Sequence, residues 1–299
     1  MALEVIVNGT TGNGWIPQVW AQEVLQNLRN AIVMAPRVNR DYDTQVADYG
    51  DTVNVPKPLS LTAQDAPIDR SATSNVAGDS VAVTLNKFKT VDVKVTDLFR
   101  AQSRPDVIAQ VTRAAGIALA EAIENDLLAL YSAAAANVGT AGTDVTAAVL
   151  RQARQKLVEA KVPAAERKYV ILSPKDYTAI LGDTNITNAL NYGGAEAIRA
   201  GQAPSVYGLE LLESQLTPVV AGTPATTYNL AFARDFAVLV TRPLPAPLDG
   251  TPSAIVRDTE TGLAFRMTLE YENKAHIISV DVLYGVAALR PEFAVQVLG

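Results

Sequence analysis

The chain has 299 residues, of which 48% are hydrophobic and 19% are charged, and its net charge at pH 7 is -6. This composition fits an ordered protein of one large domain or two smaller ones, and it excludes a disordered chain or a disulfide-rich miniprotein. The chain has no cysteine and one histidine, His276, which excludes thiol nucleophiles, cysteine-built metal sites and sites that need two histidines. The acidic balance is the wrong sign for a protein whose main task is to grip nucleic acid by its phosphates.

The N-terminal residues carry no basic cluster, so we expect no targeting signal and a cytoplasmic product. Crossing a bilayer needs about 18 uncharged apolar residues in a row. The most apolar helical stretch, residues 107–130, is interrupted by charged side chains, which we expect to mark the wetter side of that helix: Arg113, Glu121, Glu124 and Asp126. We therefore expect no membrane insertion.

Residues 16–34 are predicted to form an amphipathic helix, because apolar residues recur at steps of three and four. Pro17 suits the first turn, and Pro36 ends the run. Both tryptophans, Trp15 and Trp20, lie here, and large aromatic side chains are enriched where surfaces lose water. Two interpretations stay open: the helix packs on its own core, or it docks on a neighbouring subunit.

An extended region follows, in which residues 52–55 and 81–95 alternate between apolar and polar side chains and predict paired strands. The interval between them, residues 59–79, has little apolar periodicity and is far longer than a hairpin turn. It includes Pro67 and Arg70. We interpret it as an arm that lies on another subunit, or else as a mobile surface excursion.

Three helices are predicted in the middle of the chain. The longest covers residues 107–135, begins after the cap Ser103 and would be about 40 Å long, a rigid beam. After a flexible stretch, residues 137–142, Asp144 is expected to cap a helix that runs to residue 160. A buried strand, residues 169–172, then leads into a helix that is capped by Ser173 and closed by Gly182.

The C-terminal half is predicted to be mostly strands. Residues 185–201 are expected to form an exposed loop, and strands follow at residues 209–213, 228–233 and 236–241. Residues 263–271 and 276–289 alternate clearly and are joined by the short turn Glu272-Asn-Lys-Ala275, which predicts a hairpin.

Catalytic motifs are absent. Gly12-Asn-Gly14 begins a dinucleotide-binding motif, but Pro17 stands at its third glycine and no strand precedes it. A lone His276 in a strand is more often packed or at the surface than a general base. One acidic cluster could hold a divalent ion, although a solvated loop is the simpler interpretation: Asp41, Asp43, Asp48 and Asp51. We predict no catalytic, cofactor-binding or metal site.

Five segments, in this order along the chain, resemble one protein family. They are Tyr49-Gly-Asp-Thr-Val-Asn-Val-Pro56; residues 103–135; Lys168-Tyr-Val-Ile-Leu-Ser-Pro-Lys-Asp-Tyr177; Ala231-Phe-Ala-Arg-Asp-Phe236 with Arg242-Pro-Leu; and Val280-Asp-Val-Leu-Tyr-Gly-Val286 with Leu289-Arg-Pro-Glu292. The chain thus resembles the major capsid (coat) proteins of tailed bacteriophages, which share the HK97-like fold.

The resemblance implies an α+β fold with an N-terminal arm, an extended β-hairpin called the E-loop, a long spine helix in a peripheral domain, and a mixed α/β axial domain. The implied divisions are an arm with its helix at 1–40, the E-loop and flanking strands at 41–100, the spine helix at 101–143, the axial domain at 144–245, and C-terminal strands that complete both domains at 246–299.

The resemblance also implies a structural protein that self-assembles into pentamers and hexamers of an icosahedral shell around the phage DNA. The implied location is the virion, after assembly in the host cytoplasm. The implied partners are other copies of the chain, a separate scaffolding protein, a portal, a decoration protein and the packaged double-stranded DNA through weak non-specific contact, with no membrane and no cofactor.

Contacts between subunits are expected at Trp15, Trp20, Lys57, Pro67, Arg70, Lys87, Lys89, Arg113, Tyr192, Gly193 and Gly194. Some relatives form a covalent cross-link between an E-loop lysine and an asparagine of a neighbour. Lys57, Lys87 and Lys89 lie in or near this loop, and nothing in the sequence marks one of them as reactive.

Two other functions stay open. One is an encapsulin-type shell of a bacterial nanocompartment, which would enclose protein cargo in place of DNA. The other is a soluble α/β enzyme, which would need a deep pocket with converging carboxylates.

Overall fold

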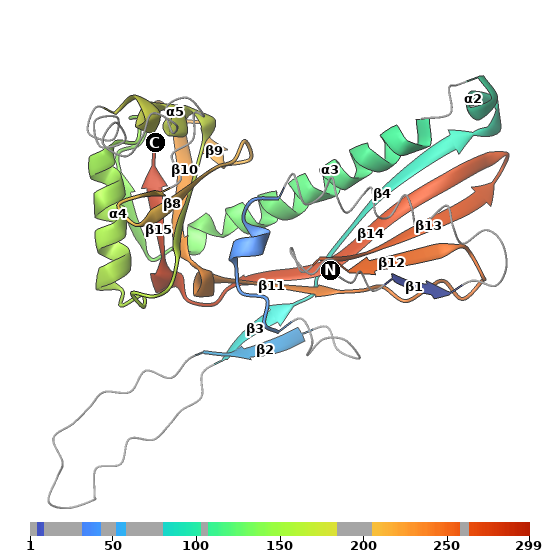
Figure 1. The fold of residues 1–299 in the computed structure, drawn as a ribbon, viewed down its shortest axis with the longest axis horizontal. Coiled ribbons are helices and arrows are strands. Elements are labelled where there is room, and N and C mark those ends of the chain that lie inside the picture. The colour runs from blue at the N-terminus through green and yellow to red at the C-terminus, as the bar shows by residue number, and fades with distance from the viewer. Residues whose placement is uncertain are drawn as a thin grey trace, which may run out of the picture.

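Two β-sheets of different shape organise the chain (Figure 1). The computed structural model describes residues 5–8, 32–42, 52–57, 80–102, 107–183, 205–257 and 263–299. We call the part built on the longer sheet the long lobe and the part built on the other large sheet the compact lobe. One hydrophobic core runs through both lobes, and Tyr284 and Leu230 both belong to it.

The sheet of the long lobe has the strand order β1-β12-β13-β14-β11, and β4 also pairs with β14. Every pairing in it is antiparallel. Its strands are β1 (Val5–Asn8), β4 (Lys87–Thr96), β11 (Ala237–Arg242), β12 (Ser253–Arg257), β13 (Ala264–Glu272) and β14 (Ala275–Ala288).

The predicted C-terminal hairpin is confirmed as β13 and β14. Glu272 pairs with Ala275, and the two turn residues, Asn273 and Lys274, have φ angles of 52° and 58°. Two successive residues in the left-handed region are typical of the tight turns whose twist matches antiparallel strands.

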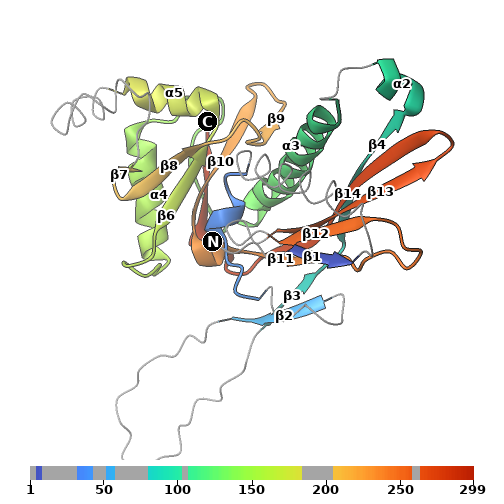
Figure 2. The same ribbon diagram turned by 45° about the vertical axis from the view of Figure 1, so that its right-hand side comes forward.

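A long helix, α3 (Val107–Leu128), lies along one face of this sheet, as Figures 1 and 2 show. Leu119, Ile123 and Leu127 are buried on the side that meets the sheet. The helix is shorter than predicted, because the chain tightens into the 3-10 turn η3 (Ala129–Ala133) before it enters the compact lobe.

A second prediction for this helix was wrong. Glu124 was expected on its wetter side, yet its side chain is fully buried. Positions 120, 123, 124 and 127 follow the three- and four-residue steps of one helix face, so Glu124 belongs to the buried stripe.

The compact lobe is built on a sheet with the order β5-β15-β10-β6-β8-β7, and β9 pairs with β10. Strands β10 and β6 are buried along most of their length, as expected where a sheet is covered on both faces. The elements are β5 (Ala136–Gly139), α4 (Ala147–Glu159), β6 (Lys168–Leu172), α5 (Pro174–Gly182), β7 (Ser205–Val206), β8 (Leu209–Glu213), β9 (Val219–Val220), β10 (Thr226–Ala233) and β15 (Ala294–Leu298), with the 3-10 turns η4 (Arg234–Phe236) and η5 (Pro291–Phe293) beside them.

Two predictions for the compact lobe were wrong. The stretch expected to be flexible begins with strand β5, which pairs in parallel with β15 from the other end of the sequence. The N-cap position of α4 is Thr146 and not Asp144, and the Thr146 side chain makes no capping hydrogen bond. The Asp144 carboxylate instead lies 3.2 Å from Lys175 Nζ. In contrast, the predicted cap of α5 is confirmed, since Ser173 Oγ accepts a hydrogen bond from the Asp176 N–H at 3.2 Å.

A separate pair of strands, β2 (Thr52–Pro56) and β3 (Ser80–Thr84), confirms the pairing expected around the long interval. It lies on the face of the long sheet opposite α3, over a small second core: Val53, Val55, Val83, Leu85, Val238, Val240 and Leu289. Gly285 of β14 permits this approach, because a Cβ added there would lie 2.5 Å from the Thr84 carbonyl oxygen.

Two more elements complete the described chain. Helix α2 (Asp97–Gln102) continues from β4 at the far end of the long lobe (Figure 1). The 3-10 turn η1 (Ala35–Arg37) lies in residues 32–42, where the two lobes meet. Residues 16–31 of the predicted N-terminal helix lie outside the described residues, and residues 32–34 are not helical.

Candidate assembly surfaces

The sequence predicted contact residues along the whole chain, and the described residues include the side chains of Lys57, Lys87 and Lys89. Lys57 directly follows β2. The remaining predicted contact residues lie outside the described residues: Trp15, Trp20, Pro67, Arg70, Tyr192, Gly193 and Gly194. Arg113 lies in α3, but its side chain is outside the described part of the chain.

Lys87 forms an ion pair inside its own subunit. Its Nζ lies 2.8 Å from Asp126 Oδ1 on α3, and the Tyr284 hydroxyl donates to Asp126 Oδ2 at 2.5 Å. Burial would raise the pKa of Asp126, but the hydrogen bonds from Lys87 and Tyr284 outweigh it and lower that pKa. The cluster ties β4, α3 and β14 together, and Lys89 lies exposed two residues along β4.

The far end of the long lobe carries an exposed apolar patch that the sequence did not predict. Leu98, Phe99 and Tyr271 are 68%, 52% and 61% exposed, and we call these three residues the tip surface. Exposed apolar side chains that gather in one place mark sites of protein association. The signal in the sequence was Leu98-Phe99 directly after a strand, where a turn would ordinarily be polar.

His276 belongs to the polar support of this tip. The Tyr271 hydroxyl donates to Asp97 at 2.6 Å, which raises the pKa of Tyr271, and its ring lies 4.9 Å from the His276 ring. The Asp97 N–H donates to the Lys274 carbonyl at 3.0 Å, and His276 Nε2 lies 3.8 Å from Asp97. These contacts fasten α2 to the β13–β14 turn.

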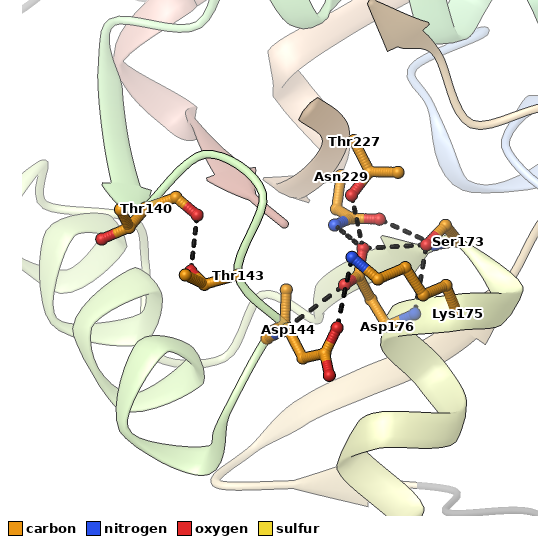
Figure 3. A network of polar contacts seen from close by, with 9 residues as sticks. Thr140, Thr143, Asp144, Ser173, Lys175, Asp176, Thr227 and Asn229 are labelled. Carbon is orange, nitrogen blue, oxygen red and sulfur yellow. Dashed lines mark hydrogen bonds and ion pairs between the residues drawn. The ribbon is translucent and has the colours of Figure 1, made fainter. Parts of the chain in front are cut away.

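A buried polar network in the compact lobe has the residue types of an active site (Figure 3). Asp176 accepts hydrogen bonds from Ser173 Oγ at 2.8 Å, Thr227 Oγ1 at 2.8 Å and Asn229 Nδ2 at 2.7 Å. The Val145 N–H adds a contact of 3.4 Å. Two of these donors lie on β10, one at the start of α5 and one in the loop before α4, so the carboxylate joins these three elements.

The network is closed to substrates. Asp176 and Asn229 are fully buried, and a Cβ added at Gly299 would collide with Asp176 and Thr227. The Ser173 hydroxyl is engaged both as the helix cap and as a donor to Asp176. The Asp176 carboxylate therefore has a structural role: its hydrogen bonds are satisfied within the protein, and it holds three elements in place.

The described residues also hold no group of three or more histidine, cysteine, aspartate or glutamate side chains that could bind a metal ion. Asp41, from the acidic cluster, pairs instead with Arg234 at 2.5 Å. Within the same described ranges, none of the helices is long and apolar enough to cross a membrane.

Known proteins share both the sequence pattern and the fold. A family model described as "Phage capsid protein" matches residues 78–297. A structure from Mycobacterium phage Che8 is similar over 89% of this chain and 90% of its own, with 22% identity and a TM-score of 0.65. No curated protein sequence matches the chain.

Two further structures share the fold at lower identity. The capsid structure of cyanophage P-SCSP1u covers 87% of this chain and 84% of its own, with 17% identity and a TM-score of 0.62. A virus-like particle from Pyrococcus furiosus covers 95% and 99%, with 12% identity and a TM-score of 0.55. The expected HK97-like resemblance is thus confirmed, and because the family match spans most of the sequence, this chain belongs to the phage capsid protein family.

Proposed function

We propose that the chain is the major capsid protein of a tailed bacteriophage and that its copies assemble as pentamers and hexamers into the icosahedral head shell around double-stranded DNA. The family match over residues 78–297 carries this proposal, because it takes in nearly all of both lobes. A closed shell needs contacts that repeat around its symmetry axes, so one chain must present several self-complementary surfaces.

In this role, α3 is the spine helix of a peripheral domain formed by the long lobe, and the compact lobe is the axial domain. The β2–β3 pair is the base of the E-loop. Pro56 pairs with Ser80, so the two ends of the segment between them lie side by side. The second core beneath β2 and β3 supports this role, because it gives the arm its own attachment to the long sheet.

The tip surface is a contact between subunits in this proposal. Its three large side chains are exposed in the single chain although they lie together beside a rigid hairpin. Burying apolar area stabilises an interface by about 25 cal/mol for each Å². A patch at the end of a long lobe can therefore join subunits whose compact lobes are far apart.

The net charge of -6 fits a shell that surrounds DNA. Binding to phosphates relies on an excess of lysine and arginine, which this chain lacks. The contact with packaged DNA is therefore weak and non-specific in the proposed role, and closure of the shell depends on contacts between proteins.

An encapsulin-type shell is the second candidate, because the fold is shared with a virus-like particle from Pyrococcus furiosus and is therefore found in a particle that is not described as a phage head. The two functions differ in what the shell encloses. Particles isolated from cells that carry the native context of the gene should contain double-stranded DNA that is protected from nuclease. Particles that hold a defined protein and no protected DNA would favour the encapsulin-type shell and contradict the proposed one.

The arm tests assembly separately from folding. Replacing residues 59–79 with Asn-Gly leaves a four-residue loop between β2 and β3 that starts with Lys57-Pro58, and this sequence suits a tight turn. We expect a folded monomer with unchanged unfolding that forms no shells in sedimentation. A matched control replaces the same residues with a Gly-Ser linker of equal length. This control keeps the length of the arm and removes its side chains, so it shows which of the two assembly requires. A variant that no longer folds would show that this segment belongs to the core.

A further inference from the structure

Residues 32–42, which we call the strap, cross the junction between the two lobes (Figures 1 and 2). The strap contacts α3, strand β11 and the compact lobe. These three attachments differ in strength, and the difference determines how the strap can open.

The polar attachment to α3 is a single buried carboxylate, and the strap also adds Ile32, Met34, Ala35 and Val38 to the main hydrophobic core. The Met34 N–H donates to both carboxylate oxygens of Glu124, at 2.8 Å and 3.1 Å. Hydrogen bonds from the backbone of Val33 and Ala35 also act on it. Glu124, Met34 and Ala35 are each 0% exposed, and a glutamate is almost never fully buried unless it is held in this way.

The attachment to β11 consists of two backbone hydrogen bonds at Asn39. Its N–H donates to the Ala237 carbonyl, and its carbonyl accepts from the Leu239 N–H, both at 3.0 Å. This is a single bridge and not a strand of the sheet.

The attachment to the compact lobe consists of partly exposed side chains together with the buried Asn39, whose Nδ2 donates to Asp235 Oδ1 at 3.0 Å. Arg37 lies 3.4 Å from Glu210 and over the ring of Tyr169, and Asp41 pairs with Arg234. Solvent-exposed ion pairs of this kind are individually weak. Among the ionisable groups that hold the strap in the described chain, the Glu124 carboxyl is the fully buried one.

We propose that the strap is a releasable element and that the buried carboxyl of Glu124 is its fastening point. When the strap lifts, the N–H groups of residues 33–35 and the carboxyl of Glu124 gain water together. Ile32, Met34, Ala35 and Val38 of the strap leave the main core when the strap lifts, whereas Ile123 and Leu127 on either side of Glu124 still pack against the long sheet.

The opening of the strap depends on pH through the protonation of the Glu124 carboxyl. Burial raises the pKa of Glu124 from 4.5 to about 7, although the backbone donors and Arg37 lower it. In the open strap the hydrated carboxyl returns to its ordinary pKa. The closed form therefore binds the extra proton between pH 4.5 and about 7, so closing is favoured at low pH and weakens as the pH rises through 7.

Few charged groups of the described residues lie near Glu124. On the strap, Arg37 faces Glu124, and on the compact lobe Glu210 pairs with Arg37. On α3 itself the nearest acids are Glu121, which is exposed, and Asp126, which is held by Lys87 of β4 and Tyr284 of β14. Burial also raises the pKa of Glu166 in the compact lobe, which contacts Asp235, so this residue needs its own control.

A thiol reporter measures the opening of the strap, because the chain has no native cysteine. Met34→Cys places a fully buried thiol on the strap, and Val280→Cys places one in the sheet, where it reports global unfolding. Labelling rates of the full chain are measured from pH 5.5 to 8.5 and divided by those of a small thiol with the same thiolate fraction. The backgrounds are the native chain, Glu124→Gln, and the controls Glu121→Gln and Glu166→Gln.

We expect the corrected labelling of Met34→Cys to rise about 30-fold across this pH range, as the pKa values of 4.5 and about 7 require. The rise should persist in Glu121→Gln and Glu166→Gln, and Glu124→Gln should abolish it. Hydrogen exchange of the amides of residues 33–35 in the native chain, divided by the intrinsic base-catalysed rate at each pH, should give the same profile without any substitution. An equal rise in Glu124→Gln, or equal labelling at Met34→Cys and Val280→Cys at every pH, would overturn the proposal.

Discussion

The two lobes bury their strands in different ways. In the compact lobe, β6 and β10 are buried along most of their length, and Phe232 packs near the rings of Tyr169 and Phe236. In the long lobe, β14 mixes buried and half-buried positions, one face lies on α3, the β2–β3 pair covers part of the other, and the far end exposes the tip surface. A sheet covered on both faces has its strands buried within the subunit, whereas a long sheet with an exposed end supplies surface for neighbours.

The largest effect on stability is expected in the compact lobe. Phe232→Ala removes a fully buried ring and should lower the free energy of unfolding by about 3–5 kcal/mol in denaturant titration. The matched variant in the long lobe is Phe88→Ala, whose side chain is 54% exposed and should cost under about 0.5 kcal/mol. Similar losses for both variants would break the distinction between the lobes.

The next effect concerns the network in Figure 3. Asp176→Ala leaves the buried donors of Ser173, Thr227 and Asn229 without their acceptor and should cost about 3 kcal/mol. Asp144→Ala, next to Val145 whose N–H contacts Asp176, removes an exposed ion pair with Lys175 and should cost under about 1 kcal/mol. Chemical unfolding of both variants measures the difference, and a small loss for Asp176→Ala would mean that the network is not closed.

A smaller effect is expected where the β2–β3 pair crosses the long sheet. Gly285→Ala places a methyl group against the backbone of Thr84 and should cost about 1–3 kcal/mol by overpacking. Gly182→Ala is the control, because an added Cβ there meets no atom within 4 Å. If the two variants have the same midpoint temperature of unfolding, β3 packs less closely on β14 than the structure shows.

The smallest effect on stability should accompany a large effect on association. Leu98→Ser with Phe99→Ser changes exposed side chains and should shift unfolding by under about 0.5 kcal/mol for each residue. Shell formation, followed by sedimentation, should nevertheless fall sharply. Normal assembly of this double variant would show that the tip surface is not a contact between subunits.

The sequence predicted those parts of the fold in which one short segment carries its own pattern. The C-terminal hairpin, the strands around the arm, the long helix and the Ser173 cap each follow from alternation, helical spacing or a capping residue. Strand β5 could not be predicted in this way, because four residues of mixed polarity become a strand only by pairing with β15 at the other end of the chain.

The candidate surfaces were harder to predict than the elements. Lys87 was expected to contact other subunits, and in the structure it forms an ion pair with Asp126 of α3 in its own subunit. The contacts between subunits that were expected from the sequence remain predictions. Glu124 was assigned to the wet side because it is charged, although its helical position placed it on the buried stripe. The strap that covers it comes from 90 residues earlier in the sequence, and no local pattern reveals such a contact.

The central claim is that this chain builds a closed shell. Electron microscopy of the purified full-length chain, concentrated under assembly conditions, tests that claim most directly. Closed shells, or rings of five and six subunits, are the predicted result. A well-folded chain that remains monomeric at high concentration under those conditions would contradict it.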